Sequence, residues 1–183
     1  MKKLFLLLII CTPFITKAQK VDVNSLVLPV KDNAIFYEEV VKVNPSLTTS
    51  SLYTSGKIWF VNYFKDAKAV VQLEDEAKGM IIGKGVLRYQ YGSILSMITV
   101  YAECTISLAF KAGRYRYQIY DIKGTQDISG TSFPLDLNEA YTKYKNKKSV
   151  KLNYKILKGL DEQIQITIQS MKKAISVKTD NNF

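Results

Sequence analysis

Residues 98–110 alternate strictly between two kinds of side chain, and this pattern constrains the fold more than any other feature of the sequence. The side chains of one parity are apolar or small: Ile98, Val100, Ala102, Cys104, Ile106, Leu108 and Phe110. Those between them are largely polar. Because successive side chains of a strand point to opposite faces, the pattern predicts a long strand with one buried side and one open side.

A second strand follows the two-residue turn Ala112-Gly113. Such a loop pairs Lys111 with Arg114, and therefore also pairs Phe110 with Tyr115, Leu108 with Tyr117 and Ala109 with Arg116. Apolar side chains then face apolar side chains, whereas a shift of one residue would break the match along the whole hairpin. The sequence thus predicts the register, with a small local penalty where the like charges of Lys111 and Arg114 stand side by side.

The aromatic segment at residues 52–68 contains the only tryptophan of the chain. If residues 50–64 form a helix, one stripe holds Leu52, Gly56, Trp59, Phe60, Tyr63 and Phe64. Aromatic stripes this dense are usually buried, so we expect Trp59 in the core rather than on a recognition surface. A glycine inside a helix costs about 1 kcal/mol, so we expect a sheet backbone to approach closely at Gly56.

Shorter patterns indicate the other elements. Strands are expected at residues 35–43, 69–75 and 80–89, with a turn at 76–79 and with Gly83 and Gly85 marking a bulge or a close backbone approach. Apolar residues spaced three and four apart predict a long amphipathic helix at residues 150–177. The order of strand, helix, four consecutive strands and long helix indicates an α+β fold.

The first 18 residues have the layout of a secretory signal peptide, with two lysines, an apolar run and Ala18 before the expected cleavage point. We therefore expect Sec-type export to the periplasm or the outside of the cell. Lipid attachment at Cys11 is disfavoured, because Ile10 is not the small residue that should precede a lipidated cysteine.

The expected organisation is a single domain, since 183 residues more often form one domain than two. It is divided into the signal peptide 1–18, an N-terminal linker 19–32, the core 33–122, a polar basic linker 123–149, and the C-terminal helix 150–177, which belongs to the same domain. Whether residues 123–141 cover the outer side of the sheet is left open.

Positive charge gathers near the C-terminus. The whole chain carries a net charge of +10, and residues 143–183 alone hold ten lysines against three acidic residues. The predicted helix displays Lys151, Lys155, Lys158, Lys172 and Lys173. These side chains could attract anionic lipid headgroups, an acidic polysaccharide or nucleic acid, although nucleic acid fits an exported chain poorly. We favour the alternative of a docked helix with a solvated basic side.

The chain has no histidine, which excludes Ser-His-Asp catalysis, Cys-His catalysis and histidine metal ligation. Residues 79–85, GMIIGKG, lack the spacing and the Ser or Thr of a phosphate loop. Glu38 and Glu39 should point to opposite faces of a strand, and the acidic cluster 74–76 lies at a turn. Cys104 should be a buried, inert thiol. We predict no enzymatic activity, no catalytic residue, no cofactor and no metal site.

The polar outer face of the sheet is the remaining candidate for function. Its expected side chains are Tyr101, Thr105, Arg114, Arg116, Gln118 and Tyr120. Tyrosine and arginine are enriched at binding surfaces, although an ordinary solvated face has the same composition. The first hypothesis is an exported, non-catalytic module that binds an envelope protein, glycan or lipid through this face. The second is a peripheral membrane protein held by the C-terminal helix, and the third is an enzyme of unrecognised type.

The stretch LYTSGKIWFVNYFKDAKAVVQLEDEAKGMIIGKG also resembles a known family. The resemblance rests on Leu52-Tyr53, Trp59-Phe60, Phe64, the passage Glu74 to Gly79 and Gly83-Lys84-Gly85, and it covers roughly residues 33–122. The family consists of uncharacterised exported bacterial proteins, described as a domain of unknown function with a TATA-binding-protein-like fold. The resemblance implies a curved antiparallel sheet with helices on one face, in the order β-α-β-β-β-β-α, and a Gram-negative source. It implies no activity and no catalytic residue.

Overall fold

The computed structural model describes residues 25–64, 71–93 and 96–176. The predicted signal peptide, residues 1–18, lies outside the described residues and stays a prediction. The first part of the predicted N-terminal linker and residues 69–70 of the predicted third element also lie outside them.

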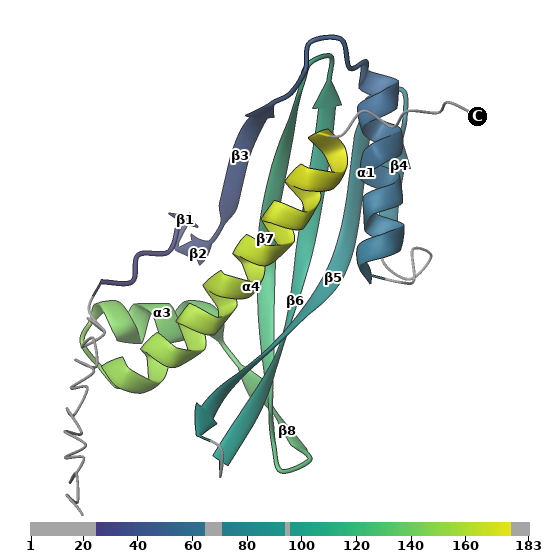
Figure 1. Ribbon diagram of the computed structural model, residues 1–183. Coiled ribbons are helices and arrows are strands. Elements are labelled where there is room, and N and C mark those ends of the chain that lie inside the picture. Colours follow the sequence, from purple (N-terminus) through teal and green to yellow (C-terminus); the bar gives the residue numbers. More distant parts are fainter. Residues whose placement is uncertain (1–24, 65–70, 94–95, 177–183) are drawn as a thin grey trace, which may run out of the picture.

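The core of the fold is a six-stranded antiparallel sheet (Figure 1). Its strands are β3 (Tyr37–Lys42), β4 (Val71–Asp75), β5 (Met80–Ser93), β6 (Ser96–Lys111), β7 (Arg114–Ile128) and β8 (Thr131–Leu135). The strand order is β3-β7-β6-β5-β4, and β8 pairs with the far end of β7. A small ribbon of β1 (Val30–Lys31) and β2 (Ala34–Ile35) precedes β3, so the predicted strand 35–43 is interrupted at Phe36.

The predicted hairpin register is confirmed. Lys111 pairs with Arg114, Phe110 with Tyr115 and Leu108 with Tyr117. The inward row of β6 is buried from Val100 to Phe110, while Ile98 is partly buried. Alternation over a long strand, combined with a two-residue turn, was therefore sufficient to fix both the faces and the pairing.

Two helices cover the same face of the sheet (Figure 1). The aromatic helix α1 (Thr49–Phe64) matches the prediction, and Trp59 is only 3 % exposed. The reason for Gly56 differs from the expected one, because the ring of Phe110, not a sheet backbone, fills the space where a Cβ would stand. Gly85 likewise lies against the ring of Phe64. The predicted irregularity is found at Gly83, where the register of β4 against β5 shifts between the pairs Val71–Gly83 and Leu73–Ile82.

The C-terminal helix α4 (Val150–Ser176) docks on the sheet along its apolar side. Ile156, Leu157, Leu160, Ile164, Ile168, Met171 and Ile175 are buried there. Polar contacts also tie it down: the Tyr37 hydroxyl donates to Asp161 at 2.9 Å, and Lys172 Nζ lies 2.6 Å from Glu39 Oε2. This packing matches the docked helix with a solvated basic side.

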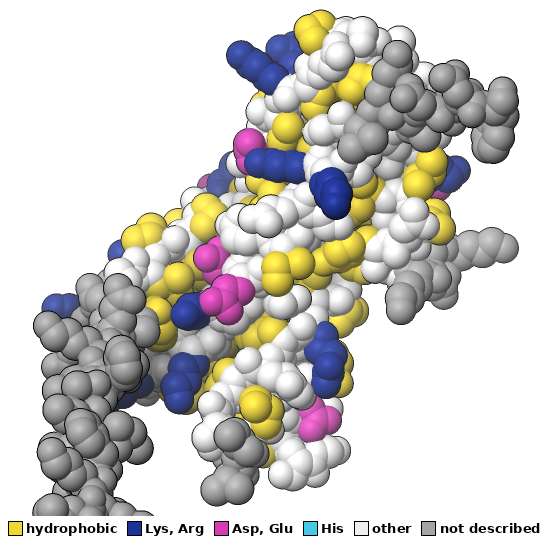
Figure 2. Space-filling view, in the orientation of Figure 1, with side chains coloured by type: hydrophobic (Ala, Val, Ile, Leu, Met, Phe, Trp, Pro, Cys, Tyr) yellow, Lys and Arg dark blue, Asp and Glu magenta, His cyan; other side chains and the backbone are white. Residues whose placement is uncertain are grey.

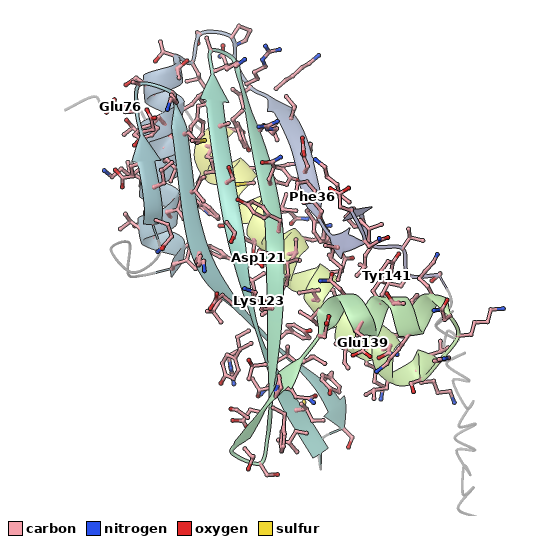
Figure 3. The ribbon with its side chains drawn as sticks, turned by 180° about the vertical axis from the view of Figure 1, so that it is seen from behind. Phe36, Glu76, Asp121, Lys123, Glu139 and Tyr141 are labelled. Carbon is pink, nitrogen blue, oxygen red and sulfur yellow. The ribbon has the colours of Figure 1, made fainter. Side chains whose placement is uncertain are left out.

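The predicted linker at residues 123–149 is wrong. Strand β7 continues to Ile128, β8 returns along it, and helix α3 (Leu137–Lys145) follows, with the Asp136 carboxylate capping its first turn by accepting from the Glu139 amide. The end of β7 and strand β8 bury no side chain, and α3 is short, so the composition of the segment looks polar like that of a loop. Helix α3 packs on α4, and the view from behind shows α3 beside the strands rather than across the open side of the sheet (Figure 3).

The described part of the predicted N-terminal linker is also packed rather than free. Leu28 is 2 % exposed, and its amide donates to the Tyr141 hydroxyl of α3 at 3.2 Å. The Leu26 amide donates to Tyr144 in the same way. Within the described residues, no helix is both long and apolar enough to cross a membrane.

Candidate functional site

The side of the sheet opposite α1 and α4 forms the open face, defined here by the outward side chains of β3, β5, β6 and β7. Seen from behind, these strands stand in front of both helices (Figure 3). None of the described helices lies across them. Because adjacent residues alternate, Glu38 points to the open face while its neighbour Glu39 reaches α4, as the sequence predicted.

The structure brings four of the six predicted residues into one line on β7: Arg114, Arg116, Gln118 and Tyr120. Thr105 is paired with Tyr120 on the neighbouring strand. Tyr101 is separate, because it pairs with Thr125 on the other side of a register shift, and its side chain is 38 % exposed.

The prediction that Thr105 is accessible on the outer face is wrong. Thr105 and Ser107 are each only 8 % exposed, although no described element covers their side of the sheet. Longer side chains from the two adjacent strands stand on either side, with Lys84 and Tyr120 flanking Thr105. The middle of the open face is therefore a sunken row of small hydroxyl side chains, which alternation alone does not predict.

Two of the predicted residues are held by an acidic side chain on β3. Gln118 Nε2 donates to Glu38 Oε2 at 2.9 Å, and Arg116 Nη1 lies 3.9 Å from Glu38 Oε1. The ring of Tyr120 lies 5.9 Å from that of Phe36, which is labelled in Figure 3. The sequence did not reveal Phe36 or Glu38 as neighbours, because the pairing of β3 with β7 joins segments far apart in the chain.

Two further cations, not predicted as part of the site, share one row with Arg114 across the open face. Lys42 of β3 and Lys111 of β6 are both paired with Arg114 of β7, and all three side chains are exposed. We call Lys42, Lys111 and Arg114 the cation row. Elsewhere on this face the lysines have acidic partners, with Lys84 at 3.7 Å from Glu103.

The helix side offers a different hollow. An open groove of about 490 Å³ runs between α1 and α4, and it is lined by Ser55, Ile58, Trp59, Asn62, Tyr63, Ser170, Lys173 and Ala174. The indole N–H of Trp59 donates to the Ser170 hydroxyl at 3.2 Å across its floor. The lining is mainly apolar, and Lys173 is the one charged side chain among the described residues that form it.

The pKa shifts of Glu39, Asp75 and Cys104 hold each of these groups in its usual protonation state at neutral pH. The ion pair with Lys172 lowers the pKa of the Glu39 carboxyl, and hydrogen bonds from Lys78 lower that of Asp75. Burial raises the pKa of the Cys104 thiol to about 12, with Glu103 adding to the shift. Cys104 is therefore a protonated, poorly nucleophilic thiol in the core, as its position in the alternation predicted.

The basic side of α4 is dispersed rather than continuous. Lysines and arginines are scattered among neutral side chains on the helix-covered side (Figure 2). Lys158 lies 3.6 Å from Glu162 and Lys172 binds Glu39, whereas Lys151 and Lys155 form no ion pair within the described part of the chain. The lysines therefore do not form a single stripe along the helix.

Comparisons with known proteins place this fold. The model of a family described as "Domain of unknown function (DUF4468) with TBP-like fold" matches residues 37–124. A crystal structure of a DUF4468 family protein from Bacteroides ovatus is similar at a TM-score of 0.67 and 18% identity, covering 88% of this chain and 95% of that one. A crystal structure of a TBP-like protein from Parabacteroides distasonis is similar at a TM-score of 0.61 and 10% identity, covering 80% of this chain and 97% of that one.

The resemblance and the α+β, TBP-like fold predicted from the sequence are confirmed. No curated protein matches the sequence. The family description gives no activity, so the comparisons determine the fold and leave the function to the chemistry of the surface.

Proposed function

We propose that this protein, whose core matches a family of unknown function, is an exported, non-catalytic interaction module that holds a partner against the open face of its sheet. The observation that carries the proposal is the contrast between the two faces. Helices α1 and α4 fill one face with buried apolar side chains, while the other carries arginine, tyrosine and lysine with no described element over it.

The open face has the anatomy of a binding surface. Its centre is the sunken row of hydroxyls, and exposed apolar side chains such as Val86 and Tyr101 stand beside it. Arginine and tyrosine contribute contact area together with hydrogen bonds, which is why such residues dominate binding energies. A partner that spans the face would cover apolar and polar groups together.

Site-specific photo-crosslinking in intact cells of the native host tests the proposal. A photoreactive residue would replace Val86 or Tyr101 on the open face, with Ile58 and Ile166 on the helix side as controls of similar exposure. We expect a discrete adduct from the open face and none from the helices. Adducts confined to the helix positions, or no adduct at any position, would contradict the proposal.

Attachment to an anionic membrane surface is the second candidate, favoured by Lys145, Lys151 and Lys155, which lack ion pairs among the described residues. Most of the apolar side of α4 is already buried against the sheet, and only single apolar side chains such as Leu152 and Ile166 are exposed on this helix, so electrostatic attraction would supply most of the affinity in this mode. Co-sedimentation with anionic vesicles tests it. Binding that disappears with added salt and with the triple Lys→Gln variant at these positions would favour membrane attachment.

A further inference from the structure

The cation row destabilises the folded state by charge repulsion, and no acidic side chain of the described residues neutralises it. Residues directly opposite each other on neighbouring antiparallel strands have Cβ atoms roughly 5 Å apart, and like charges at that spacing destabilise a sheet. Arg114 has such a neighbour on both sides, Lys42 and Lys111. The described residues provide no ion pair to any of the three, because the nearby Glu38 is engaged by Arg116 and Gln118.

The row stands on a rigid support. It lies where β6 turns into β7, and the turn residue Gly113 has a φ of +69°, which glycine tolerates. The Gly113 carbonyl accepts from the Val43 amide and its own amide donates to the Leu47 carbonyl, both at 3.0 Å. The loop after β3 therefore fixes the turn from two sides, and β3 itself carries Lys42. A backbone that is fixed before binding loses no conformational freedom when a ligand arrives, so only the three side chains would have to be ordered.

We infer that the cation row binds a phosphorylated ligand, with a diphosphate group as the best match. The three charges span roughly 10 Å at the spacing of neighbouring strands, which suits one compact, multiply charged group. A phosphoryl group brings about −1.5 to −2 charges and three acceptor oxygens, whereas a carboxylate brings one charge. The guanidinium of Arg114 offers a planar fork for two oxygens, and a lysine on each side adds a point charge.

The inference deepens the proposed function, since it assigns a ligand chemistry to one end of the open face. The experiments can contradict the inference and the proposed function independently of each other. Crosslinks from Val86 and Tyr101 without phosphate binding would overturn this inference alone, and phosphate binding without those crosslinks would overturn the proposed use of the whole face.

Calorimetric titration with inorganic pyrophosphate at low salt tests the site. We expect binding by the wild-type protein, an affinity about tenfold weaker in Arg114→Gln, and no measurable binding in the triple variant Lys42→Gln, Lys111→Gln, Arg114→Gln. Lys147→Gln, Lys148→Gln, Lys173→Gln is the matched control, since it removes the same charge from exposed positions outside the cation row and should bind like wild type. Circular dichroism checks that each variant is folded.

The possible sources of the phosphate are separated by vesicles of phosphatidic acid and of phosphatidylcholine. A lipid headgroup is supported if the protein co-sediments with phosphatidic acid vesicles but not with phosphatidylcholine vesicles. This binding should be lost in the cation-row variant and displaced by pyrophosphate. Pyrophosphate binding without vesicle binding supports a soluble ligand. No binding of either probe, or equal loss in the control variant, would overturn the inference, because the effect would then follow net charge rather than the row.

Discussion

The two faces of the sheet differ in how their charged groups are paired. On the helix side, Asp161 and Lys172 of α4 are paired with Tyr37 and Glu39 of β3, and Tyr63 of α1 is paired with Thr167 of α4 at 2.9 Å. Only the uncharged hydroxyls of Tyr89 and Tyr115 are buried there without a hydrogen-bond partner among the described residues. On the open face, Arg114 stands between two lysines without an acidic partner among the described residues. The helix side is thus arranged for stability, whereas the open face retains a local repulsion that a ligand could relieve.

The largest effect should come from emptying the helix side. Phe60 is fully buried on α1, so Phe60→Ala should lower the free energy of unfolding by about 3–5 kcal/mol through lost burial and the remaining cavity. Urea denaturation measures this change. Ile58→Ala on the same helix, which removes an exposed side chain, should change stability by less than about 0.5 kcal/mol. Similar losses for both would show that α1 is not packed as described.

Overfilling the same interface should have a smaller effect. Although alanine is the better helix former, Gly56→Ala should destabilise the protein by about 1–3 kcal/mol, because the new methyl group meets the ring of Phe110. Thermal denaturation measures the loss. Adding Phe110→Leu should cost less in the Gly56→Ala background than in wild type, since the smaller side chain relieves the clash. Additive losses would contradict this packing.

Breaking the ion pair between α4 and the sheet should lower the free energy of unfolding by a smaller amount still. Glu39 is partly exposed, so Glu39→Gln should cost only about 0.5–1 kcal/mol at neutral pH. Lys172 holds the pKa of Glu39 below its ordinary value, so this stability is present above the unfolded pKa of about 4.3 and is lost as pH falls through the folded pKa. Urea denaturation across pH should therefore show the two proteins converging in acid. A constant difference would exclude the ion pair as its cause.

The smallest effect on the free energy of unfolding should be a stabilisation, from a substitution on the open face. Arg114→Gln should raise the free energy of unfolding by about 0.2–1 kcal/mol, because it removes the central charge of the cation row. Added salt should stabilise the wild type more than the variant, since screening relieves the same repulsion. Thermal denaturation across salt concentrations measures both. Destabilisation by Arg114→Gln would mean that the row has a structural role.

The local features of the fold were predictable from the sequence. The β6–β7 register follows from alternation and a two-residue turn, and the burial of Trp59 follows from helical spacing. The pairing of β3 with β7 was not predictable in this way, because it joins residues about 80 positions apart with no local pattern to specify it. The contacts of Glu38 and the grouping of Lys42 with Arg114 depend on that pairing.

The candidate site was therefore predicted in part. Alternation correctly assigned Arg114, Arg116 and Gln118 to the open side of β7. It failed for the accessibility of Thr105, since alternation gives a direction and not the height of the neighbouring side chains. The extension of β7 beyond Tyr120 was not predicted, because the inward and outward positions exchange at Asp121. An interrupted alternation is normally the sign of a strand end.

That change of parity has a consequence for how the chain tolerates length changes. The left-handed Asp121, at φ 52°, adds one residue to β7 opposite Cys104, so Ile122 turns inward and Lys123 outward. Deleting one residue there would exchange the roles of every side chain from Ile122 to Ile128 and present charge to the interior. Insertions at the β7–β8 tip, where Gly130 has no close neighbour, would leave this phase intact.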